Sequence, residues 1–388
     1  MKRNVLVVLL CCGLLMGILC GCGGSKPAES TELPVTTPSP SVTEAETLEP
    51  SVTEAETLEP VTEVPITEPE TLEPETEPVT TEPETEPAPE TTEPQEDQRT
   101  LFYETFRELD PEATDAWLAT HPEYFSGDYT AIAVNQAWLT DQGLDLETVH
   151  GHQVLAIDAK EGILIVRVWL NNSRGVLAIA KDPSRLHLCA SETMGVKGER
   201  IGSIAQRNNG VLAMTGSGFI DPNGAGNGGQ IAGFCMCDGE KYGRPMGWNY
   251  ARFELTESNW AVVTHADGSP SQYTTDCMEF TPALLIDGAL QDPGIWTGEN
   301  PRACIGQSEN GDILMMGVEG RFKDSPGCSV LECAKVLQQY GGQNAINVDG
   351  GTTAIVWYRG EPIMRCSNRN TPEGRYLPNA WVYEKAGE

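Results

Sequence analysis

The stretch Asn344-Ala-Ile-Asn-Val-Asp-Gly-Gly-Thr-Thr-Ala-Ile-Val-Trp357 decides how the fold is interpreted. Its apolar residues predict two short strands, over 345–348 and 354–357. Between them lie Asp349, the pair Gly350-Gly351 and two threonines. An acid at a strand end, followed by glycine amides and hydroxyls, suits a polar or phosphorylated ligand. The same letters also fit a two-residue hairpin turn in which Asp349 only bonds the backbone. Both interpretations stay open at this point.

The chain before this stretch predicts strands that lead into a glycine-rich loop. Strands are expected over 154–157, 162–170, 176–180 and 211–214, with a short helix over 198–208. The last strand enters Thr215–Gly229, which lacks the lysine and the strand–loop–helix context of a nucleotide phosphate loop. Asp221 and Asn227 within it suit a sugar- or phosphate-lined cleft, although a flexible surface loop fits the composition equally well.

Two arginines flank a predicted hairpin. Arg302 begins a strand that a turn at 309–312 links to a second strand over 313–318, and Glu319-Gly-Arg321 follows. A planar guanidinium binds phosphate or carboxylate well, so Arg302 and Arg321 are candidates for that role. A surface or salt-bridged arginine is the commoner case for either one alone.

The C-terminal third predicts one more helix and a last strand. Ser325-Pro326 marks the expected start of the helix and Gly341-Gly342 its end. One face of this helix carries Val330, Ala334 and Leu337. A final strand over 375–383 is expected to return beside the opening stretch.

The N-terminus predicts export and lipid attachment. Lys2-Arg3 and the apolar run 4–19 form a secretory signal that is too short for a membrane span. The run ends in Leu19-Cys-Gly-Cys22, which resembles the bacterial lipobox. By this resemblance residues 1–21 are removed and Cys22 carries the lipid, with two acyl chains because a single chain anchors only marginally. A plain cleaved signal with incidental cysteines is the alternative.

Residues 22–98 predict a disordered acidic tether rich in Pro, Thr and Glu. A ten-residue unit, Ser-Val-Thr-Glu-Ala-Glu-Thr-Leu-Glu-Pro, occurs at 41–50 and again at 51–60, with too few apolar side chains for packing. Between 26 and 98 the chain holds 21 acidic residues and one lysine, which gives −20 of the net charge of −32. Proline and like-charge repulsion extend such a segment to about 3 Å per residue. The acidity argues against a nucleic-acid partner, which needs a basic face.

A small helical leader is expected over 99–149, before the main domain at 150–388. Its first helix has one apolar stripe, formed by Leu101, Phe102, Phe106 and Leu109. Asp110-Pro111 predicts the N-cap and first turn of a second helix. For the main domain we expect an α+β fold, with a mixed β-sheet and packed helices.

Four blocks in order resemble the phosphodiester glycosidase family, whose best-known member removes N-acetylglucosamine from a sugar phosphodiester. They are Thr215–Gly229, Pro301-Arg-Ala-Cys-Ile-Gly-Gln307, Asn347-Val-Asp-Gly-Gly-Thr352 and Arg375–Asn379. The likeness covers roughly residues 150–385 and looks closest to bacterial members that are secreted or wall-associated.

The resemblance implies site residues. Asp349 would be the catalytic carboxylate, with Glu319 as a reserve acid or base. Substrate contacts would come from Arg302, Arg321, Arg375, Thr352, Gly350, Gly351, Asp221 and Asn227. Three positions depart from the family: Thr215 replaces Asn, Glu319 replaces Asp and Thr352 replaces Ser. The last two keep the chemical group, whereas Thr215 does not, which bears on whether the ligand and the activity are the ordinary ones.

Cysteines are the remaining reactive residues of the main domain. There are eight, at 189, 235, 237, 277, 304, 328, 333 and 366, and their irregular spacing favours buried free thiols over a disulfide framework. Cys235-Met-Cys237 with His187-Leu-Cys189 is an alternative zinc set, but its spacing is not that of a standard finger or ribbon. A nucleophilic role for Cys304 would need a histidine that the sequence does not place beside it. Neither a metal nor a cofactor is expected.

Together these features predict a lipid-anchored, extracytoplasmic hydrolase of sugar–phosphate diesters in cell-wall or exopolysaccharide glycans. An oxocarbenium-like transition state needs a nearby carboxylate, and a leaving phosphate needs cationic and amide donors more than a strong acid. One alternative is a non-catalytic lipoprotein of the same fold that binds wall glycans. Another is a protein-binding partner in polysaccharide assembly.

Overall fold

The computed structural model describes residues 93–135, 138, 143–292, 294–368 and 371–387. All of these belong to one unit, Thr85–Glu388. The expected signal peptide, Cys22 and the tether up to residue 92 lie outside the described residues. No helix in the described ranges has the length and apolar character needed to cross a membrane.

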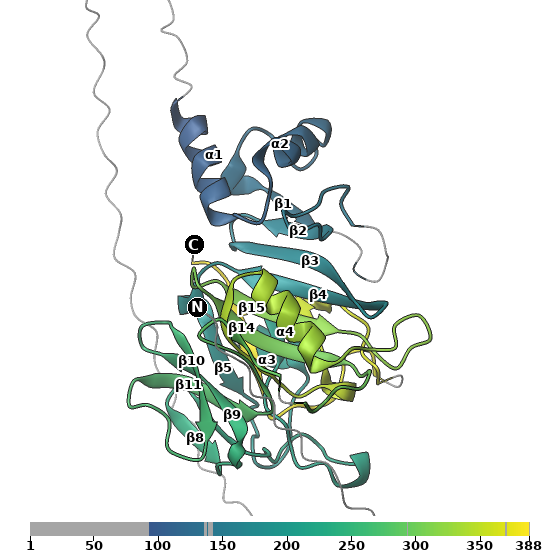
Figure 1. Cartoon of the computed structure of the whole chain (residues 1–388). Helices are drawn as coiled ribbons and strands as arrows, with labels where there is room; N and C mark the ends of the chain where they lie inside the picture. The colour runs from purple at the N-terminus through teal and green to yellow at the C-terminus, as the bar shows by residue number, and fades with distance from the viewer. Residues whose placement is uncertain (1–92, 136–137, 139–142, 293, 369–370, 388) are drawn as a thin grey trace, which may run out of the picture. The chain divides into compact units, whose positions relative to one another are not determined.

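The largest sheet has nine strands and forms the centre of the fold (Figure 1). In spatial order its strands are β1 (Ala133–Asn135), β2 (Val154–Asp158), β3 (Ile163–Leu170), β4 (Ser173–Ala180), β15 (Ile313–Val318), β14 (Arg302–Ser308), β16 (Gly342–Asn347), β12 (Ala283–Ile286) and β13 (Ala289–Leu290). The opening stretch of the sequence enters this sheet as β16, between β14 and β12.

Two five-stranded sheets complete the β structure. One contains β10 (Ala261–Ala266), β9 (Gly247–Thr256), β11 (Thr274–Phe280), β7 (Phe234–Cys237) and β8 (Glu240–Gly243). The other contains β18 (Glu361–Pro362), β17 (Val356–Tyr358), β6 (Gly210–Thr215), β19 (Asn379–Glu384) and β5 (Leu186–Ala190). The second half of the opening stretch is β17, so its two strands belong to different sheets. The hairpin interpretation of Asp349-Gly-Gly is therefore wrong.

The expectation of a mixed sheet is also wrong, because every strand pairing in the described ranges is antiparallel. Several neighbours in the main sheet are joined by tight turns, such as Asn171-Asn172 between β3 and β4. Short turns of this kind can join only antiparallel strands. The domain is mostly β with few helices, which agrees only roughly with an α+β class.

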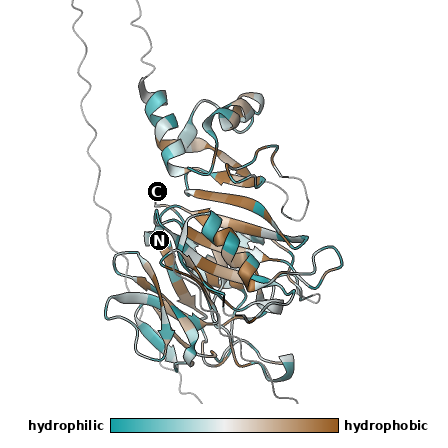
Figure 2. Cartoon of the chain, in the orientation of Figure 1, coloured by the Kyte–Doolittle hydropathy of each residue, from teal (hydrophilic) through white to brown (hydrophobic). Residues whose placement is uncertain are grey.

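Apolar side chains cover both faces of the nine-stranded sheet, whose strands are largely brown in Figure 2. One core cluster lies between this sheet and the two smaller sheets, and includes Ile165, Leu212, Phe253 and Trp381. A second cluster lies on the opposite face of the nine-stranded sheet. Because both faces are buried, a strand such as β15 is a continuous apolar run, with little of the alternation typical of a solvated sheet.

The described part of the chain has four α-helices, which pack on these sheets: α1 (Glu93–Thr105), α2 (Pro111–Thr120), α3 (Ile201–Arg207) and α4 (Val330–Gln339). The buried residues of α4 include Val330, Ala334 and Leu337, as the sequence predicts. This helix begins after Ser329 instead of Ser325, because Ser329 and Glu332 form a capping box. The last six residues of the expected tether, 93–98, belong to α1 instead.

Residues 99–149 contain α2 and most of α1, and they also add β1 to the edge of the nine-stranded sheet. Phe102, Phe106 and Trp117 join the second core cluster, whereas Leu101 is 60% exposed and does not belong to the expected stripe. Asp110 caps α2 as predicted, accepting a hydrogen bond from the Ala113 amide at 2.8 Å. Whether this segment is a separate leader remains a prediction.

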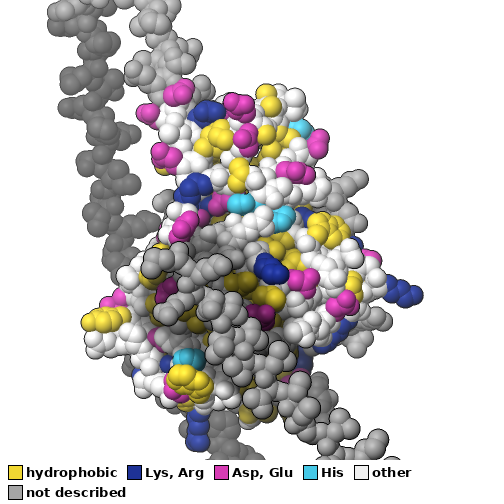
Figure 3. Space-filling model, viewed as in Figure 1, with side chains coloured by type: hydrophobic (Ala, Val, Ile, Leu, Met, Phe, Trp, Pro, Cys, Tyr) yellow, Lys and Arg dark blue, Asp and Glu magenta, His cyan; other side chains and the backbone are white. Residues whose placement is uncertain are grey.

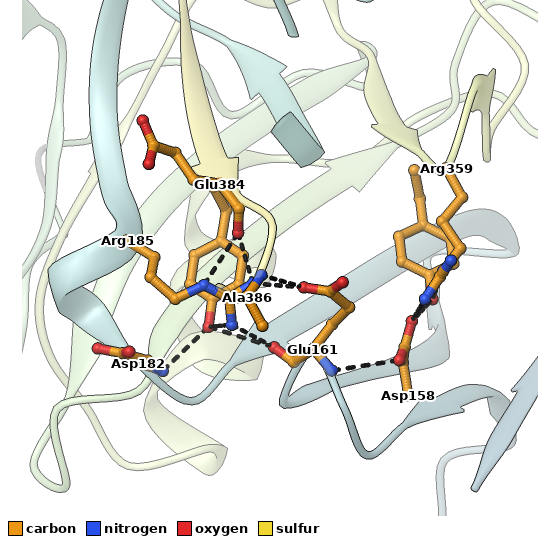
Figure 4. Close-up of polar contacts among 9 residues, drawn as sticks. Asp158, Glu161, Asp182, Arg185, Arg359, Glu384 and Ala386 are labelled. Atoms are coloured by element: carbon orange, nitrogen blue, oxygen red, sulfur yellow. Dashed lines mark hydrogen bonds and ion pairs between the residues drawn. The ribbon is translucent and has the colours of Figure 1, made fainter. Parts of the chain in front are cut away.

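A polar network fastens the C-terminal end to the turn between β2 and β3 (Figure 4). The guanidinium of Arg185 contacts the carboxylate of Glu161 at 2.5 Å and donates to the carbonyl of Glu384. Glu161 also accepts from the Ala386 amide at 2.7 Å. These contacts hold β19 in the sheet, where it lies between β6 and β5 and not directly beside the opening stretch.

Candidate active site

Asp349 lies where three strand ends meet. It follows β16, and its amide donates to the carbonyl of Gly216, just after β6, at 3.5 Å. The amide of Gly351 donates to the carbonyl of Pro301, just before β14, at 3.1 Å. The Asp-Gly-Gly turn is thus the crossover from the nine-stranded sheet to a five-stranded sheet, tied to both.

Side chains hold four successive carbonyls of this turn. Gly350 accepts from the Thr353 hydroxyl (2.5 Å), Gly351 from Ser367 (3.0 Å), Thr352 from the Cys366 thiol (3.2 Å) and Thr353 from Thr215 (2.6 Å). A turn fixed by so many partners keeps one conformation, which is what a catalytic carboxylate requires.

Burial and charge act in opposite directions on Asp349. Its side chain is only partly accessible to solvent. Desolvation raises the pKa of Asp349 to about 7, against the lowering effects of the Thr353 hydroxyl and the Arg375 charge. A carboxyl group with a pKa near neutrality exchanges its proton in the ordinary pH range, and such groups gather at functional sites.

Arg375 and Asp221 form an ion pair whose charges both act on Asp349. The guanidinium of Arg375 contacts Asp221 at 2.5 and 2.8 Å and donates to the carbonyl of Gly226 at 3.0 Å. This pairing lowers the pKa of Asp221. The structure therefore brings together three of the predicted site residues, from the β16 end, the glycine-rich loop and the segment before β19.

The glycines of the loop serve close backbone packing. A Cβ on Gly228 would lie 2.1 Å from the carbonyl oxygen of Tyr376, and one on Gly229 would lie 2.4 Å from the Lys197 amide. Asn227 donates to the carbonyl of Val196 and accepts from the Gly229 amide, so both ends of its side chain bond the backbone. The loop is packed against its neighbours and Asn227 organises it; a ligand contact by Asn227 stays a prediction.

Arg321 extends over the turn from the segment after β15. A Cβ on Gly351 would lie 3.3 Å from Nη2 of Arg321, so glycine lets the guanidinium approach the backbone. Nη2 also donates to the side-chain oxygen of Asn300 at 3.2 Å. Gly351 has φ 64°, a second reason for glycine at this position. Among the predicted arginines, Arg321 has an exposed guanidinium beside Asp349-Gly-Gly.

Arg302 and Glu319 are engaged within the protein. Arg302 is 3% exposed and donates to the main-chain carbonyls of Trp296, Gly298 and Cys328. Glu319 is 1% exposed and accepts two hydrogen bonds from the Arg365 guanidinium, at 2.9 and 2.6 Å. The substrate-binding role of Arg302 and the reserve role of Glu319 both stay predictions, and the geometry gives each a structural partner.

The departure at Thr215 has a structural explanation. This residue is fully buried, its hydroxyl donates to the carbonyl of Thr353, and it accepts from the Ile355 amide at 3.2 Å. Thr215 therefore supports the turn through buried hydrogen bonds. Thr352 is partly exposed at the turn, but the Thr353 hydroxyl is the one that contacts Asp349. The sequence did not single out Thr353, because Thr352 and Thr353 are adjacent after the glycines and nothing in the sequence shows which hydroxyl contacts Asp349.

Two cavities of about 440 Å³ lie elsewhere, and neither is lined by Asp349. The first is lined by residues that include His187, Cys189 and Cys237. All eight cysteines of the domain are free thiols, and the described residues hold no group of three or more His, Cys, Asp or Glu arranged to bind a metal. On the face drawn in Figure 3, Lys and Arg side chains lie as separate spots among acidic and uncharged ones.

Some solved structures are distantly similar to this chain. The catalytic domain of zebrafish N-acetylglucosamine-1-phosphodiester alpha-N-acetylglucosaminidase, auto-inhibited by its pro-peptide, has TM-score 0.48 and 16% identity over 66% of this chain and 88% of that chain. A hypothetical protein from Synechocystis has TM-score 0.44 and 15% identity over 60% and 63% of the two chains. A putative exported protein from Burkholderia pseudomallei has TM-score 0.41 and 14% identity over 55% and 74%.

A search with the sequence finds no match among curated proteins. The family comparison does find one: residues 208–384 match the phosphodiester glycosidase family. The matched range begins just before β6 and ends with β19, so it contains the glycine-rich loop, the Asp-Gly-Gly turn and Arg375. Residues 208–384 thus form a domain of the phosphodiester glycosidase family, which confirms the resemblance that the sequence motifs indicate.

Proposed function

We propose that this domain hydrolyses a sugar–phosphate diester at the anomeric carbon. The observation that carries the proposal is Asp349, a partly accessible carboxyl group with a pKa of about 7 in the Asp-Gly-Gly block of the matched family. Burial makes its ionised form reactive, and a fixed turn holds it in one place. A carboxylate in this state stabilises positive charge on a sugar ring or accepts a proton from water.

The reaction needs few groups. Water attacks the anomeric carbon as the bond to the phosphate oxygen breaks, the phosphate monoester leaves, and Asp349 accepts a proton from the water. Arg321, beside Gly351, and Arg375, whose charge acts on Asp349, supply positive charge near the turn, which offsets repulsion between the carboxylate and an anionic substrate. Gly350 and Gly351 contribute mainly by allowing close packing, because the Gly351 amide already donates to Pro301 and that of Gly350 to Asp349.

The substrate class and location extend this proposal. The N-terminal signal, Cys22 and the acidic tether favour a domain that is lipid-anchored at the outer side of the cell membrane. The substrates available to a domain at that location are glycosyl-phosphate links in cell-wall or exopolysaccharide glycans. The zebrafish protein named above acts on an N-acetylglucosamine phosphodiester, which makes esters of N-acetylglucosaminyl phosphate the first substrates to try.

Sugar release from the methyl ester of N-acetylglucosaminyl phosphate tests the proposal. Asp349→Asn is expected to lower kcat/KM by at least about a hundredfold. Asp267→Asn, which changes an exposed carboxylate in a β10–β11 loop, is the matched control and should keep the wild-type rate. An Asp349→Asn variant with wild-type turnover would remove Asp349 from the mechanism. Binding of wall glycan without hydrolysis of any ester would favour the non-catalytic alternative.

A further inference from the structure

We propose that Trp296 contacts the leaving group of the substrate, beyond the phosphate as seen from Asp349. In this arrangement the buried Arg302 is the positioning residue that holds Trp296 in place. The inference rests on the proposed function and deepens it, because it assigns to the substrate a leaving group that carries a ring with a flat apolar face. A sugar and a nucleobase share that chemistry.

A continuous set of contacts joins the Asp349 turn to the loop that carries Trp296. Gly351 donates to the carbonyl of Pro301, and Arg321 both covers Gly351 and donates to the side chain of Asn300. Asn300 in turn exchanges two backbone hydrogen bonds with Cys328, at 3.3 and 3.1 Å. The loop before β14 is therefore fixed to the same residues that surround the catalytic turn.

Arg302 fixes the backbone of this loop from within the protein. Its Nη2 donates to the carbonyls of Trp296 (3.0 Å) and Gly298 (2.8 Å), and its Nε donates to Cys328 at 2.9 Å. The guanidinium carbon lies 5.6 Å from the centroid of the Trp296 ring. A buried guanidinium that bonds three carbonyls is expensive to remove. These contacts account for an arginine at this position through its partners within the protein.

Trp296 has the features of a residue held for a ligand. Its backbone adopts φ 56°, which is unfavourable for a bulky side chain, and 46% of the side chain is exposed. Strained residues of this kind persist only where their surroundings fix them, and they cluster at binding sites. The flat face of an indole stacks on rings of either type, and base–aromatic stacking is sequence-tolerant for this reason.

The order of the residues matches the order of groups in a phosphodiester. Trp296 and Asn300 are four positions apart in the sequence, so their Cα atoms lie at most about 14 Å apart. Asn300 contacts Arg321, and Arg321 covers the turn that carries Asp349. Along this series of contacts, carboxylate, guanidinium and indole come in the same order as sugar, phosphate and leaving group in the substrate.

Three esters of one glycosyl phosphate test this inference with the full chain. They are the methyl ester, an ester to a methyl glucoside and an ester to uridine, all of N-acetylglucosaminyl phosphate. Trp296→Ala is expected to lower kcat/KM for the ring-bearing esters about tenfold more than for the methyl ester, mainly through KM. Trp296→Phe should restore most of the difference. Trp260→Ala, which removes another exposed indole, should change none of the three.

Arg302→Lys separates positioning from binding. Lysine cannot bond three carbonyls in this geometry, so Arg302→Lys should show the same loss of preference for ring-bearing esters as Trp296→Ala. Thermal unfolding shows whether this variant folds. If it does not fold, the comparison of Trp296→Ala with Trp296→Phe tests the contact between Trp296 and the leaving group. Whichever ring-bearing ester, the glucoside or the uridine ester, loses more kcat/KM in Trp296→Ala shows whether the leaving group carries a sugar or a nucleobase.

Equal losses on all three esters, or no loss on the ring-bearing esters, would overturn the role of Trp296 alone. A wild-type chain that cleaves none of the esters would overturn the proposed function, and this inference with it. The two failures are distinguishable because the first leaves the methyl ester reaction measurable.

Discussion

Asp349 shows how a single residue type acquires chemistry from its surroundings. The sequence places an acid at a strand end before two glycines, and this pattern made Asp349 a candidate beside the hairpin interpretation. Its raised pKa comes from desolvation, which the charge of Asp221 reinforces and that of Arg375 opposes, and no local pattern reveals these groups, which lie far away in the chain. This environment leads to two predictions, and the exposed Arg321 beside Gly351 leads to a third.

The first concerns the pH dependence of the reaction. Since the proposed mechanism uses the ionised carboxylate, kcat/KM should rise with pH through an apparent pKa of about 7 and then level off. A pH–rate profile of the wild-type chain measures this. A rate that instead falls as pH rises through about 7 would show that the protonated acid is the active form.

Stability should depend on the same proton. The pKa of Asp349 is raised from an ordinary 3.8 to about 7, so the folded protein binds this proton more tightly than the unfolded chain does. The resulting stabilisation is complete below pH 3.8 and is lost as the pH rises towards 7. Asp349→Asn, which cannot ionise, should therefore have a higher Tm than wild type above pH 7, with the gap closing in acid. Calorimetry of both proteins, with Asp267→Asn as control, measures it; a gap that is constant with pH would contradict the burial argument.

Arg321→Ala should weaken transition-state binding. Hydrogen bonds to charged groups contribute about 1.5–3 kcal/mol, so kcat/KM should fall roughly ten- to a hundredfold. Lys323→Ala removes another exposed cation two residues along and should have little effect. Equal effects of the two changes would indicate that Arg321 acts only through overall charge.

At the scale of elements, the central feature is a crossover between sheets where the sequence also allowed a hairpin. Both strands of the opening stretch were predicted nearly correctly, as β16 and β17. Their partners, β14 and β6, lie far away in the chain, so the pattern of the stretch alone did not specify which sheet each strand joins. The start of α4 was misplaced for a simpler reason: Ser325-Pro326 and Ser329 both precede the apolar face, and only Ser329 completes a capping box.

The crossover predicts a cost for changing Thr215. Thr215→Val keeps the shape but leaves the Thr353 carbonyl and the Ile355 amide without the hydroxyl that bonds them. The free energy of unfolding should fall by about 1–3 kcal/mol. Thr120→Val, which removes an exposed hydroxyl at the end of α2, is the control in denaturant unfolding. Equal stability of the two variants would show that the Thr215 hydroxyl does not support the turn.

For the whole molecule, the sequence predicted the strands of the main sheet better than their assembly. The apolar runs of β2, β3, β4 and β15 have unmistakable strand composition. The five-stranded sheet of β7–β11 was not predicted, because its strands contain charged residues such as Arg252 and Glu279, which are buried as an ion pair at 2.6 Å. Among the predicted site residues, Asp349, Asp221 and Arg375 lie close enough for their charges to interact. The guanidinium of Arg302 instead donates hydrogen bonds to main-chain carbonyls within the protein.

The predicted boundary at residue 150 can be tested at this scale. A fragment over 150–388 lacks β1, α1 and α2, so core residues such as Val154 and Ile157 would lose their cover. We expect it to unfold at a lower Tm than the chain from 93, or to aggregate. Unchanged thermal unfolding of the fragment would show that residues 99–149 are an independent leader.

Hydrolysis in water labelled with heavy oxygen tests the central claim most directly. If water attacks the anomeric carbon, mass spectrometry should find the label in the released sugar and none in the phosphate monoester. Label in the phosphate would mean that the phosphorus–oxygen bond is cleaved, which would contradict a glycosidase mechanism centred on Asp349.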